Sequence, residues 1–600
     1  MKREEIEEKY KWDLTIAYKT NEDFMKDFNY VKEELPNVAK YKEKFLETSD
    51  TFIEFMEIIE KIDRRIDKMY SYASESVDVE PNNAEVQDLN SKIKGLEEAY
   101  RNETVFIDLE ILKNEDKARK ILEDERCKKY TNMINKILRM KPHILSDETE
   151  EVLAQASGVL GTSYGTYKQI KPEFEPVIID GKEYFLNEET VRNFYRNPDE
   201  SVRKQAYEKL NIEYKKLANL YASTLEGTMK RDVFYSKVRK FKSPLEASTF
   251  GDEVTEELFY KVLDAANNKY HKYYIEYLEA FKKIMNKDIL QVYDLRYPIV
   301  KEPDKKYSVE DAFELIFEAT KNLGEEYIEI IQKAKSERWI DYMPHEGKIP
   351  GAYSSNGCYD SRPFILMSFT NDVESVFTLI HELGHSAHSY LSNHYQDYIN
   401  SNYRIFVAEV ASTVNENLLM NLLIKTAKTP EEKKYLLYKK LDEFIGCCYT
   451  QPFFANFENI LHQKVANNEG LSSQTITDIY QKVTEDEYEG RVEIHELTKY
   501  RCFAVPHFYY NYYVYKYTIG MCVASVIAQR VSSGDKTQIE NYLKFLKSGS
   551  TKSPVEALTM AGVNPLDENL YIGFPIDEDN YKAFENFKKD LDEFKKVMEI

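Results

Sequence analysis

Apolar side chains recur at intervals of three and four residues through most of this 600-residue chain. Residues 41–70 are typical, with apolar side chains at Phe45, Phe52, Phe55, Ile58, Ile59, Ile62 and Ile66. This spacing places them on one face of an α-helix. The chain has only 20 glycines and 18 prolines, so long helices are possible and an architecture of many strands is not expected. The sequence therefore predicts a mostly α-helical protein.

A β-hairpin is expected where the helical pattern first breaks. Residues 173–187 place the Asp180-Gly181 pair between two β-rich runs, which is typical of a two-residue hairpin turn. Helical spacing resumes after this segment. We therefore expect an N-terminal helical domain at 1–190 that ends in the hairpin, and a second domain at 191–600.

A small β-sheet is expected directly before one well-defined helix. Residues 351–355 (GAYSS) and 363–370 (PFILMSFT) have the composition of strands. Asn371 and Asp372 follow, and either side chain can cap a helix N-terminus. Beyond them, apolar residues return at helical spacing, at Val376, Phe377, Ile380 and Leu383.

Composition and charge exclude several classes of partner. The formal net charge is -22, which disfavours nucleic acid and anionic membranes because phosphate groups require a basic surface. The N-terminal sequence MKREEIEEKYKWDL has no apolar core of a secretory signal, and no apolar run approaches the ~20 residues of a membrane helix. The six cysteines contain no CxxC pair, so neither a disulfide scaffold nor a cysteine-ligated metal site is indicated. We expect a soluble cytoplasmic protein.

The sequence HELGH at 381–385 lies on the predicted capped helix. Positions i and i+4 share one helix face, so the imidazoles of His381 and His385 project together. HExxH is a zinc-binding pattern of metalloproteases, in which the glutamate, here Glu382, acts as general base. HELTK at 495–499 begins in the same way but has lysine at the second ligand position.

A third ligand has to come from another part of the chain. The metzincin pattern would require glycine at 388 and histidine at 391, but the chain has His388 and Leu391, which excludes that class. We expect His388 to be a packing or supporting residue, since it lies on the same face as the two ligands without completing a ligand pattern.

Glu409 is the best candidate for the third ligand. It follows His385 by 24 residues, which is enough for the helix to end, a loop to form and a second helix to return. This second helix is apolar apart from one stripe at Glu409, Ser412, Thr413 and Glu416. One glutamate would bind the metal and the other could orient an imidazole.

A third region, RCFAVPHFYYNYYVYKYTIG, is rich in hydrogen-bond donors. Pro506 suits the first turn of a helix and places His507 in that turn. On such a helix Tyr510 and Tyr517 share a stripe with His507, whereas Tyr515 lies elsewhere. Tyrosine hydroxyls and an imidazole N–H can stabilise the oxyanion formed in amide hydrolysis, although most of these tyrosines are expected to pack in the core.

These segments together resemble the M3 metallopeptidases, specifically the oligoendopeptidase F branch. The resemblance rests on HELGHSAHS, AEVASTVNE and PHFYYNYYVYKYTIG, and extends to WDL at 12–14, YDL at 293–295 and the GAYSS and RPFILMSFT segments. It covers nearly the whole chain. HExGHxxH followed by the Glu-x6-Glu pair is much more specific than HExxH alone.

The resemblance implies a mostly α-helical fold of two lobes that enclose a deep substrate channel, with a small β-sheet beside the zinc helix. It implies one zinc ion, with His381, His385 and Glu409 as ligands and Glu382 as general base. It also implies short peptides as substrates.

The resemblance assigns substrate and intermediate contacts to a histidine and tyrosines late in the chain. His507 matches that histidine, and Tyr510, Tyr515 and Tyr517 are the candidate tyrosines. The GAYSS segment matches the part of the family that lines the channel, where an extended peptide could add as a strand.

The sequence therefore predicts a zinc endopeptidase that cleaves internal bonds of short peptides. One alternative is a zinc carboxypeptidase of related helical fold, which would need a cationic group for the terminal carboxylate. Another is a helical protein that binds peptides without cleaving them, for which Glu382 would have no use. The oligomeric state and the cleavage-site preference stay open.

Overall fold

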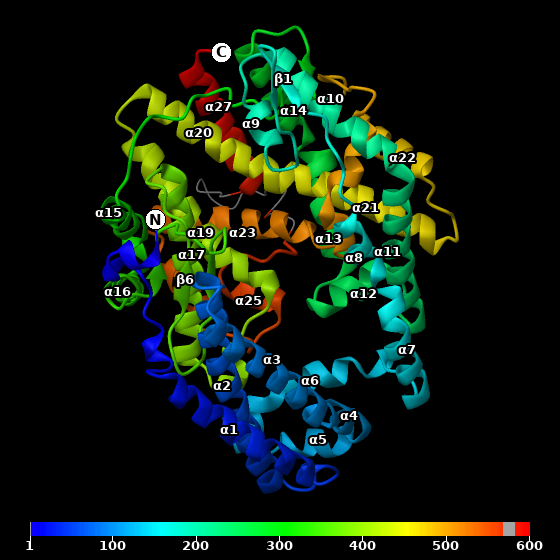
Figure 1. Ribbon diagram of the computed structural model, residues 1–600, viewed down its shortest axis with the longest axis vertical. Helices are drawn as coiled ribbons and strands as arrows, with labels where there is room; N and C mark the ends of the chain where they lie inside the picture. Colours follow the sequence, from blue (N-terminus) through cyan, green and yellow to red (C-terminus); the bar gives the residue numbers. More distant parts are fainter. Residues whose placement is uncertain (1, 568–569, 571–581) are drawn as a thin grey trace. The chain divides into compact units, whose positions relative to one another are not determined.

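The computed structural model describes residues 2–567, 570 and 582–600, and Figure 1 shows a predominantly helical molecule. The mostly α-helical fold class is therefore confirmed. The chain divides into two compact units that alternate along the sequence. Unit 1 contains Met1–Lys141, Asp304–Leu423 and Ala524–Asn564, and unit 2 contains Pro142–Pro303, Ile424–Val523 and Pro565–Ile600. These units are bounded at other positions than the expected domains at 1–190 and 191–600. The expected division into domains stays a prediction.

Unit 1 consists mainly of helices and one small sheet. Its helices are α1 (Asn21–Val38), α2 (Ser49–Val79), α3 (Ala84–Thr104), α4 (Phe106–Lys113), α5 (Glu115–Ile121), α6 (Thr131–Arg139), α15 (Val309–Thr320), α16 (Glu325–Ser336), α17 (Val373–Tyr395), α18 (Tyr398–Ser401), α24 (Lys536–Leu546) and α25 (Pro554–Met560). Two further helices, α19 (Ile405–Thr426) and α23 (Tyr515–Ser532), each contain a boundary between the units.

Helix α2 shows why these segments fold as helices. The Thr48 hydroxyl caps it by accepting the Thr51 backbone N–H, which satisfies a donor that has no partner inside the helix. Its apolar stripe is buried at Phe52, Phe55, Ile59, Ile62 and Ile66. This stripe packs against helices α1 and α3 in the core of the unit.

The sheet of unit 1 has the strand order β4-β6-β5. Its strands are β4 (Ile340–Asp341), β5 (Tyr353–Ser355) and β6 (Phe364–Leu366). β5 pairs antiparallel with β6, with Tyr353 opposite Leu366, and lies at one edge of the sheet. The predicted GAYSS and PFILMSFT strands are thus present in shortened form, while β4 was not predicted.

Two contacts hold this sheet in place. The Trp12 ring, from the WDL segment, packs edge-on against Phe364 at a centroid distance of 6.0 Å. Asp341 in β4 forms a buried ion pair with Lys348, with Nζ 2.7 Å from the carboxylate oxygen. Because the Lys348 ammonium also donates to backbone carbonyls of Asp341, Met343 and Met367, its donors are satisfied despite burial.

Unit 2 is also mostly helical. Its helices are α7 (Asp147–Leu160), α8 (Thr162–Gln169), α9 (Val191–Tyr195), α10 (Glu200–Lys216), α11 (Ala218–Val238), α12 (Pro244–Gly251), α13 (Glu256–Asp264), α14 (His271–Ile284), α20 (Pro430–Ile445), α21 (Gln451–Ala466), α22 (Ser473–Tyr488) and α27 (Ala583–Met598). Its strands are β1 (Val177–Ile179), β2 (Lys182–Tyr184), β3 (Leu290–Gln291) and β7 (Val492–Glu493).

The predicted hairpin in unit 2 is confirmed. Strands β1 and β2 pair antiparallel, with Val177 opposite Tyr184. Asp180 and Gly181 both have positive φ, 51° and 74°, as a type I′ turn requires. The YDL segment has a structural role in the same unit, because the buried Asp294 carboxylate pairs with Arg203 at 2.7 Å and with Lys287 at 2.6 Å.

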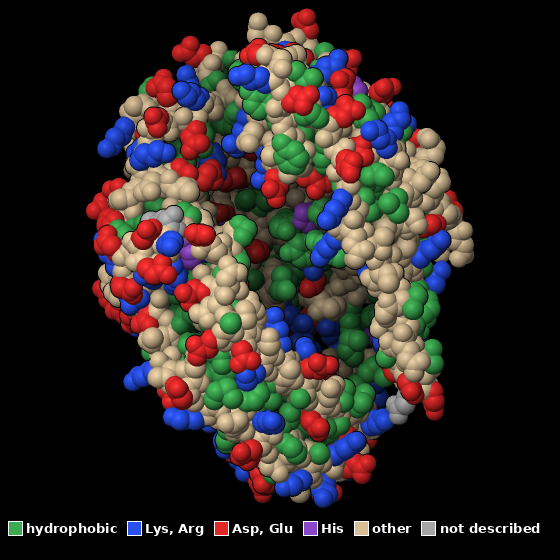
Figure 2. Space-filling view, in the orientation of Figure 1, with side chains coloured by type: hydrophobic (Ala, Val, Ile, Leu, Met, Phe, Trp, Pro, Cys, Tyr) green, Lys and Arg blue, Asp and Glu red, His purple; other side chains and the backbone are tan. Residues whose placement is uncertain are grey.

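Charged side chains of both signs are interspersed on the face shown in Figure 2. In the part of the chain that the structure describes, no helix combines the length and the hydropathy needed to cross a membrane.

Candidate metal centre

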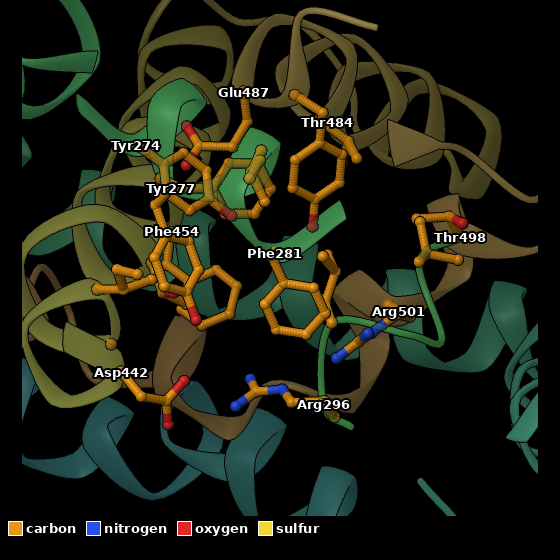
Figure 3. Close-up of a pocket in the computed structure, with 18 of the residues that line it drawn as sticks. Tyr274, Tyr277, Phe281, Arg296, Asp442, Phe454, Thr484, Glu487, Thr498 and Arg501 are labelled. Atoms are coloured by element: carbon orange, nitrogen blue, oxygen red, sulfur yellow. The ribbon is translucent and has the colours of Figure 1, made fainter. Parts of the chain in front are cut away.

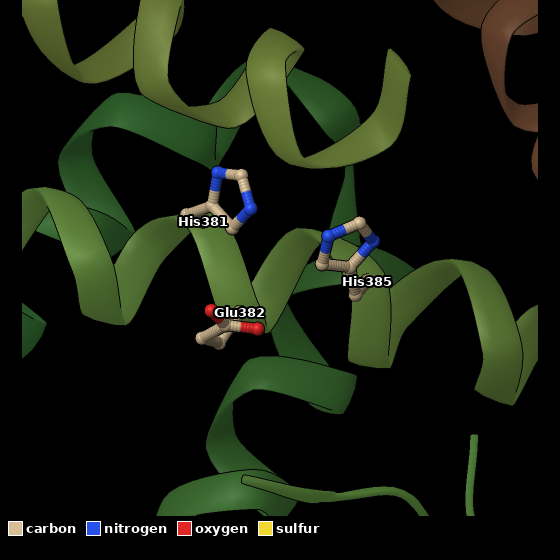
Figure 4. A group of neighbouring side chains, drawn as sticks. All are labelled: His381, Glu382 and His385. Carbon is tan, nitrogen blue, oxygen red and sulfur yellow. The ribbon is translucent and has the colours of Figure 1, made fainter. Parts of the chain in front are cut away.

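Helix α17 presents His381 and His385 of the HELGH segment on one face. The Asp372 carboxylate caps the helix by accepting the Ser375 backbone N–H at 2.8 Å, as the sequence predicted. Figure 4 shows the His381 and His385 imidazoles on the same side of α17, with the Glu382 carboxylate beside them. The donor atoms of these three residues lie within 4.8 Å of one another.

Helix α19 packs very closely against α17 at Gly384. A Cβ atom at Gly384 would lie 2.7 Å from the Ser412 Cα and 2.8 Å from the Ala411 carbonyl oxygen, closer than van der Waals contact allows. The Asn415 amide, also from α19, donates to the Ile380 carbonyl at 3.1 Å. The sequence analysis did not assign this role to Gly384, although a glycine inside a helical pattern often marks close packing.

The close packing of α19 against α17 brings Glu409 next to His381 and His385. Its Oε2 atom lies 3.5 Å from the Nε2 atom of His381 and 3.4 Å from the Nε2 atom of His385. The Ser412 hydroxyl donates to the same oxygen at 3.1 Å. The Glu409 side chain is 49 % exposed, so the group of three donor atoms is open on one side.

Glu416 lies against the other nitrogen of His381. Its Oε1 atom is 3.1 Å from His381 Nδ1. A hydrogen bond from Nδ1–H to this carboxylate fixes the tautomer in which Nε2 carries the free lone pair. The two glutamates of the predicted stripe therefore differ in position. Glu409 faces both Nε2 atoms, while Glu416 lies at the Nδ1 edge of the His381 ring.

The electrostatics of the group follow from three carboxylates, of which Glu382 is buried, next to two imidazoles. Burial acts to lower the pKa of His381, but Glu416, Glu382 and Glu409 together raise it to about 9. Burial acts to raise the pKa of Glu409, but the imidazoles of His385 and His381 lower it to about 2. Burial raises the pKa of Glu382, against the effect of the two imidazoles. The group thus favours a positive charge among its carboxylates.

Strand β5 contacts Glu382 directly. The Ser354 backbone amide acts to lower the pKa of Glu382, against the effect of burial. The Ser354 and Ser386 hydroxyls are 2.8 Å apart, which joins β5 to α17. Glu382 is only 6 % exposed, so its carboxylate lies in the interior between α17 and β5. Sequence periodicity alone gives no signal for a backbone donor of this kind.

His388 packs inside unit 1, as expected for a residue that is not a ligand. It is 1 % exposed, and its ring stacks on Tyr403 with a centroid distance of 3.7 Å and an interplanar angle of 7°. Burial lowers the pKa of His388 to about 3, so the imidazole is neutral and acts as a packing group.

His507, Tyr510 and Tyr517 form one aromatic group in unit 2. The His507 ring meets Tyr510 edge-on at 5.7 Å and Tyr517 at 6.4 Å between centroids. The Tyr510 hydroxyl lies 2.6 Å from that of Tyr164. Burial lowers the pKa of His507, which favours the neutral imidazole with a single N–H donor.

The structure corrects the expected continuous helix in this region. Pro506 is the first residue of a short 3₁₀ helix, η11 (Pro506–Tyr509), and α23 begins only at Tyr515. Asn511 and Tyr512, between the two helices, have positive φ of 48° and 56°. His507 and Tyr517 therefore meet across a bend in the chain, not along one helix.

Tyr515 does not join the aromatic group. It is fully buried and packs edge-on against Phe259 at a centroid distance of 5.4 Å. Its hydroxyl has no hydrogen-bond partner among the described residues. Of the three candidate tyrosines, only Tyr510 and Tyr517 lie beside His507.

The donor atoms at His381, His385 and Glu409 fit a metal ion. In a tetrahedral zinc site with bonds of about 2.0–2.1 Å, two ligand atoms lie about 3.3–3.4 Å apart. The Nε2–Oε2 distances of 3.5 and 3.4 Å match this spacing. Two imidazole nitrogens and one carboxylate oxygen, open on one side, are one of the ligand sets found in catalytic zinc sites.

The chain is similar in sequence and in structure to known peptidases. Residues 193–572 match the model of Peptidase family M3, and residues 111–171 match the Oligopeptidase F model. Oligopeptidase PepF of Bacillus subtilis is 34% identical over 604 residues, which cover 99% of this chain and 88% of the relative.

Two solved structures share the fold along nearly their whole length. Oligoendopeptidase-F from Enterococcus faecium has a TM-score of 0.72 at 28% identity, covering 96% of this chain and 99% of that one. A protein from Chlamydophila abortus described as a peptidase has a TM-score of 0.90 at 26% identity and covers 99% of both chains. The chain therefore belongs to peptidase family M3 and is a metallopeptidase of the oligoendopeptidase F type.

Proposed function

We propose that this metallopeptidase is a zinc-dependent endopeptidase that hydrolyses internal peptide bonds of short oligopeptides. The observation that supports it best is the spacing of three donor atoms, with Glu409 Oε2 at 3.5 and 3.4 Å from the two Nε2 atoms. His381, His385 and Glu409 would hold one zinc ion. When bound there, zinc supplies Lewis-acid polarisation of the scissile carbonyl and makes water acidic enough to ionise near neutral pH.

Glu382 is the proposed general base. Its carboxylate accepts a proton from the attacking water and later delivers that proton to the leaving amine. The Ser354 amide acts to lower the pKa of this carboxylate, and the hydrogen bond between the Ser354 and Ser386 hydroxyls ties β5 to the helix that bears the base. Proton transfer thus starts from a fixed position, which is a requirement for efficient general base catalysis.

Glu416 is proposed to orient the His381 ring rather than to bind the metal. Its carboxylate accepts from Nδ1, which leaves the Nε2 lone pair for a ligand bond. Such a carboxylate also raises the electron density on the imidazole and so strengthens it as a ligand.

His507, with Tyr510 or Tyr517 beside it, is proposed to stabilise the oxyanion. What supports this role is the clustering of the three rings and the neutral state of His507. A single donor of this kind is worth about 10²–10³ in kcat. Tyr515 is left out of this proposal because its hydroxyl is buried. A cytoplasmic location stays a prediction from the sequence.

Digestion of a peptide blocked at both ends tests the reaction class. An endopeptidase cuts a blocked nonapeptide internally, whereas a carboxypeptidase requires a free carboxylate and a non-catalytic binder leaves the peptide intact. Product masses identify the bond that is cut. Activity should disappear after chelation and return when about one equivalent of zinc is added, because His381, His385 and Glu409 would hold one ion. An intact blocked peptide with zinc bound would contradict the proposal.

A further inference from the structure

Unit 2 contains a cavity of about 190 Å³ (Figure 3). This cavity shares no residue with the metal centre, which lies in unit 1. Helix α14, the segment at 292–296, helices α20 and α22 and the 3₁₀ helix η10 (Thr498–Ala504) all contribute to its wall. Pockets for drug-sized ligands measure about 300–1,000 Å³, so this cavity is suited to a smaller molecule.

Aromatic rings form much of the wall. Buried members of this set are Tyr274, Tyr277, Phe281 and Tyr480. Rings of this kind offer a large apolar surface with little loss of conformational entropy. One part of the cavity is therefore suited to an apolar group.

Two arginines bring positive charge to the same cavity. Figure 3 shows the guanidinium groups of Arg296 and Arg501 pointing into it. Both arginines act to lower the pKa of Tyr488, which burial raises to about 12. The Arg501 guanidinium also lies 5.9 Å from the Tyr207 ring centroid, which helps to fix its position.

Neither guanidinium has a carboxylate within ion-pair distance in the described part of the chain, whereas the arginine of the YDL site, Arg203, lies 2.7 Å from Asp294. Each guanidinium has five N–H donors in a planar fork that matches a carboxylate. An arginine pair that faces a cavity without such a partner is a typical anion-binding arrangement.

The acidic residues of the cavity compensate only part of this positive charge. Burial raises the pKa of Glu487 to about 8, so this carboxyl is mostly protonated at pH 7. Desolvation also raises the pKa of Asp442, while Arg296 acts to lower it. Even with an ionised Asp442, the two guanidiniums outweigh the single carboxylate near neutral pH.

We propose that this cavity binds a small carboxylate with an apolar body: a free amino acid with a large apolar side chain, or the C-terminal residue of a short peptide. The carboxylate would accept hydrogen bonds from Arg296 and Arg501, and the apolar side chain would lie against the rings. Both sources offer the same chemistry, and peptide cleavage produces such carboxylates. The proposal concerns unit 2 alone and does not depend on the metal centre.

Isothermal titration of the full chain tests this proposal with three probes. N-acetyl-L-phenylalanine resembles a peptide C-terminus, L-phenylalanine is the free amino acid, and N-acetyl-L-phenylalaninamide has the same shape without the carboxylate. We expect one or both of the carboxylates to bind with a Kd of about 1 mM or tighter. The amide should bind at least about tenfold more weakly, because hydrogen bonds to charged groups are lost. Preference between the two carboxylates identifies the source of the ligand.

Variants locate the binding site. Arg296→Gln should weaken carboxylate binding at least about tenfold, and Arg296 is exposed, so the protein should still fold. Arg501→Lys keeps the charge but loses the planar fork and should also weaken binding. Arg491→Gln is the matched control, because Arg491 is an exposed arginine of the same unit, paired with Glu279 at 2.8 Å, and should leave binding unchanged.

Glu409→Ala separates this cavity from the metal centre, and carboxylate binding should persist in that variant. The proposal is overturned if neither carboxylate binds, if the amide binds as tightly, or if both arginine variants bind normally. It is also overturned if binding is lost in Glu409→Ala and kept in Arg296→Gln. None of these outcomes affects cleavage of a blocked peptide, so failure here is distinct from failure of the proposed peptidase function.

Discussion

The Glu416 carboxylate lies 3.1 Å from the Nδ1 atom of His381, while the Nε2 atom of the same ring lies 3.5 Å from Glu409. One imidazole thus connects two glutamates that are two helical turns apart on α19. The arrangement assigns different tasks to the two carboxylates, since one faces the proposed metal position and the other holds the ring.

Glu416→Ala should weaken zinc binding by about 10–100-fold, the usual effect of losing a carboxylate that orients a ligating histidine. The protein should still bind zinc when the metal is supplied in excess, and activity should then recover in part. Zinc affinity measured by competition with a chromophoric chelator checks this.

Glu409→Ala should lose zinc far more completely, because it removes one of three proposed ligand atoms. Metal analysis after dialysis should show little zinc in this variant and close to the wild-type content in Glu416→Ala. Loss of zinc from Glu416→Ala alone, with Glu409→Ala unaffected, would exchange the roles of the two glutamates.

Glu382→Gln should retain zinc but lose at least about 100-fold in kcat, because general base catalysis contributes roughly 10²–10⁴-fold. Glutamine keeps the size of the side chain and leaves all three proposed ligands in place. Glu496→Gln is a matched control: Glu496 also follows a histidine and precedes a leucine, in HELTK, and is exposed. Wild-type turnover in Glu382→Gln would exclude this glutamate as the base.

Local sequence predicts the elements around the metal centre well. The capping role of Asp372 depends only on the residues next to it in the sequence. The spacing of His381 and His385 likewise specifies their common face on any helix. The Asp180-Gly181 turn is equally local, since both residues tolerate positive φ. Features set by short-range chemistry can therefore be predicted from one sequence.

The bend after His507 could not be predicted, because distant residues determine it. The buried Glu458 carboxylate, from α21, accepts the Tyr512 backbone N–H at 2.5 Å. The Ser248 hydroxyl, from α12, donates to the Asn511 carbonyl at 2.8 Å. These contacts replace helical hydrogen bonds and overcome the local preference for a continuous helix. The interleaving of the two units along the chain depends on long-range packing in the same way.

Gly384→Ala should destabilise unit 1 and weaken the metal site together. The added Cβ would lie 2.7 Å from the Ser412 backbone, so α17 and α19 would have to separate, at a cost of about 1–3 kcal/mol. Ser412 also donates to Glu409, so this shift would displace a proposed ligand. The midpoint temperature of thermal unfolding and the affinity for zinc should both decrease.

Gly95→Ala is the control for this effect. Gly95 lies in α3 of the same unit, and its added Cβ would meet no atom within 4 Å. Since alanine favours helix by roughly 0.5–1 kcal/mol relative to glycine, this variant should be as stable as the wild type or more stable. Equal behaviour of the two variants would show that the close approach of α17 and α19 is unimportant.

Substrate length should be limited in this enzyme. Strand β5 has one unpaired edge in the described sheet, and its Ser354 hydroxyl contacts Ser386 of α17, so an extended peptide added at this edge would pass the base. At ~3.3 Å per residue, peptides of about 5–20 residues span roughly 17–66 Å in that form. The resemblance to oligopeptidases implies an enclosed channel, which stays a prediction. We therefore expect a blocked nonapeptide to be cut rapidly and denatured casein slowly at equal mass concentration. The reason is that both ends of a long chain must stay outside the channel while its middle is bound. Mass spectrometry of the products over time measures both rates.

Glu382→Gln distinguishes cleavage by this site from contaminating proteases. Rapid conversion of casein into small fragments by the wild type, absent in that variant, would show an open cleft and contradict the enclosed channel.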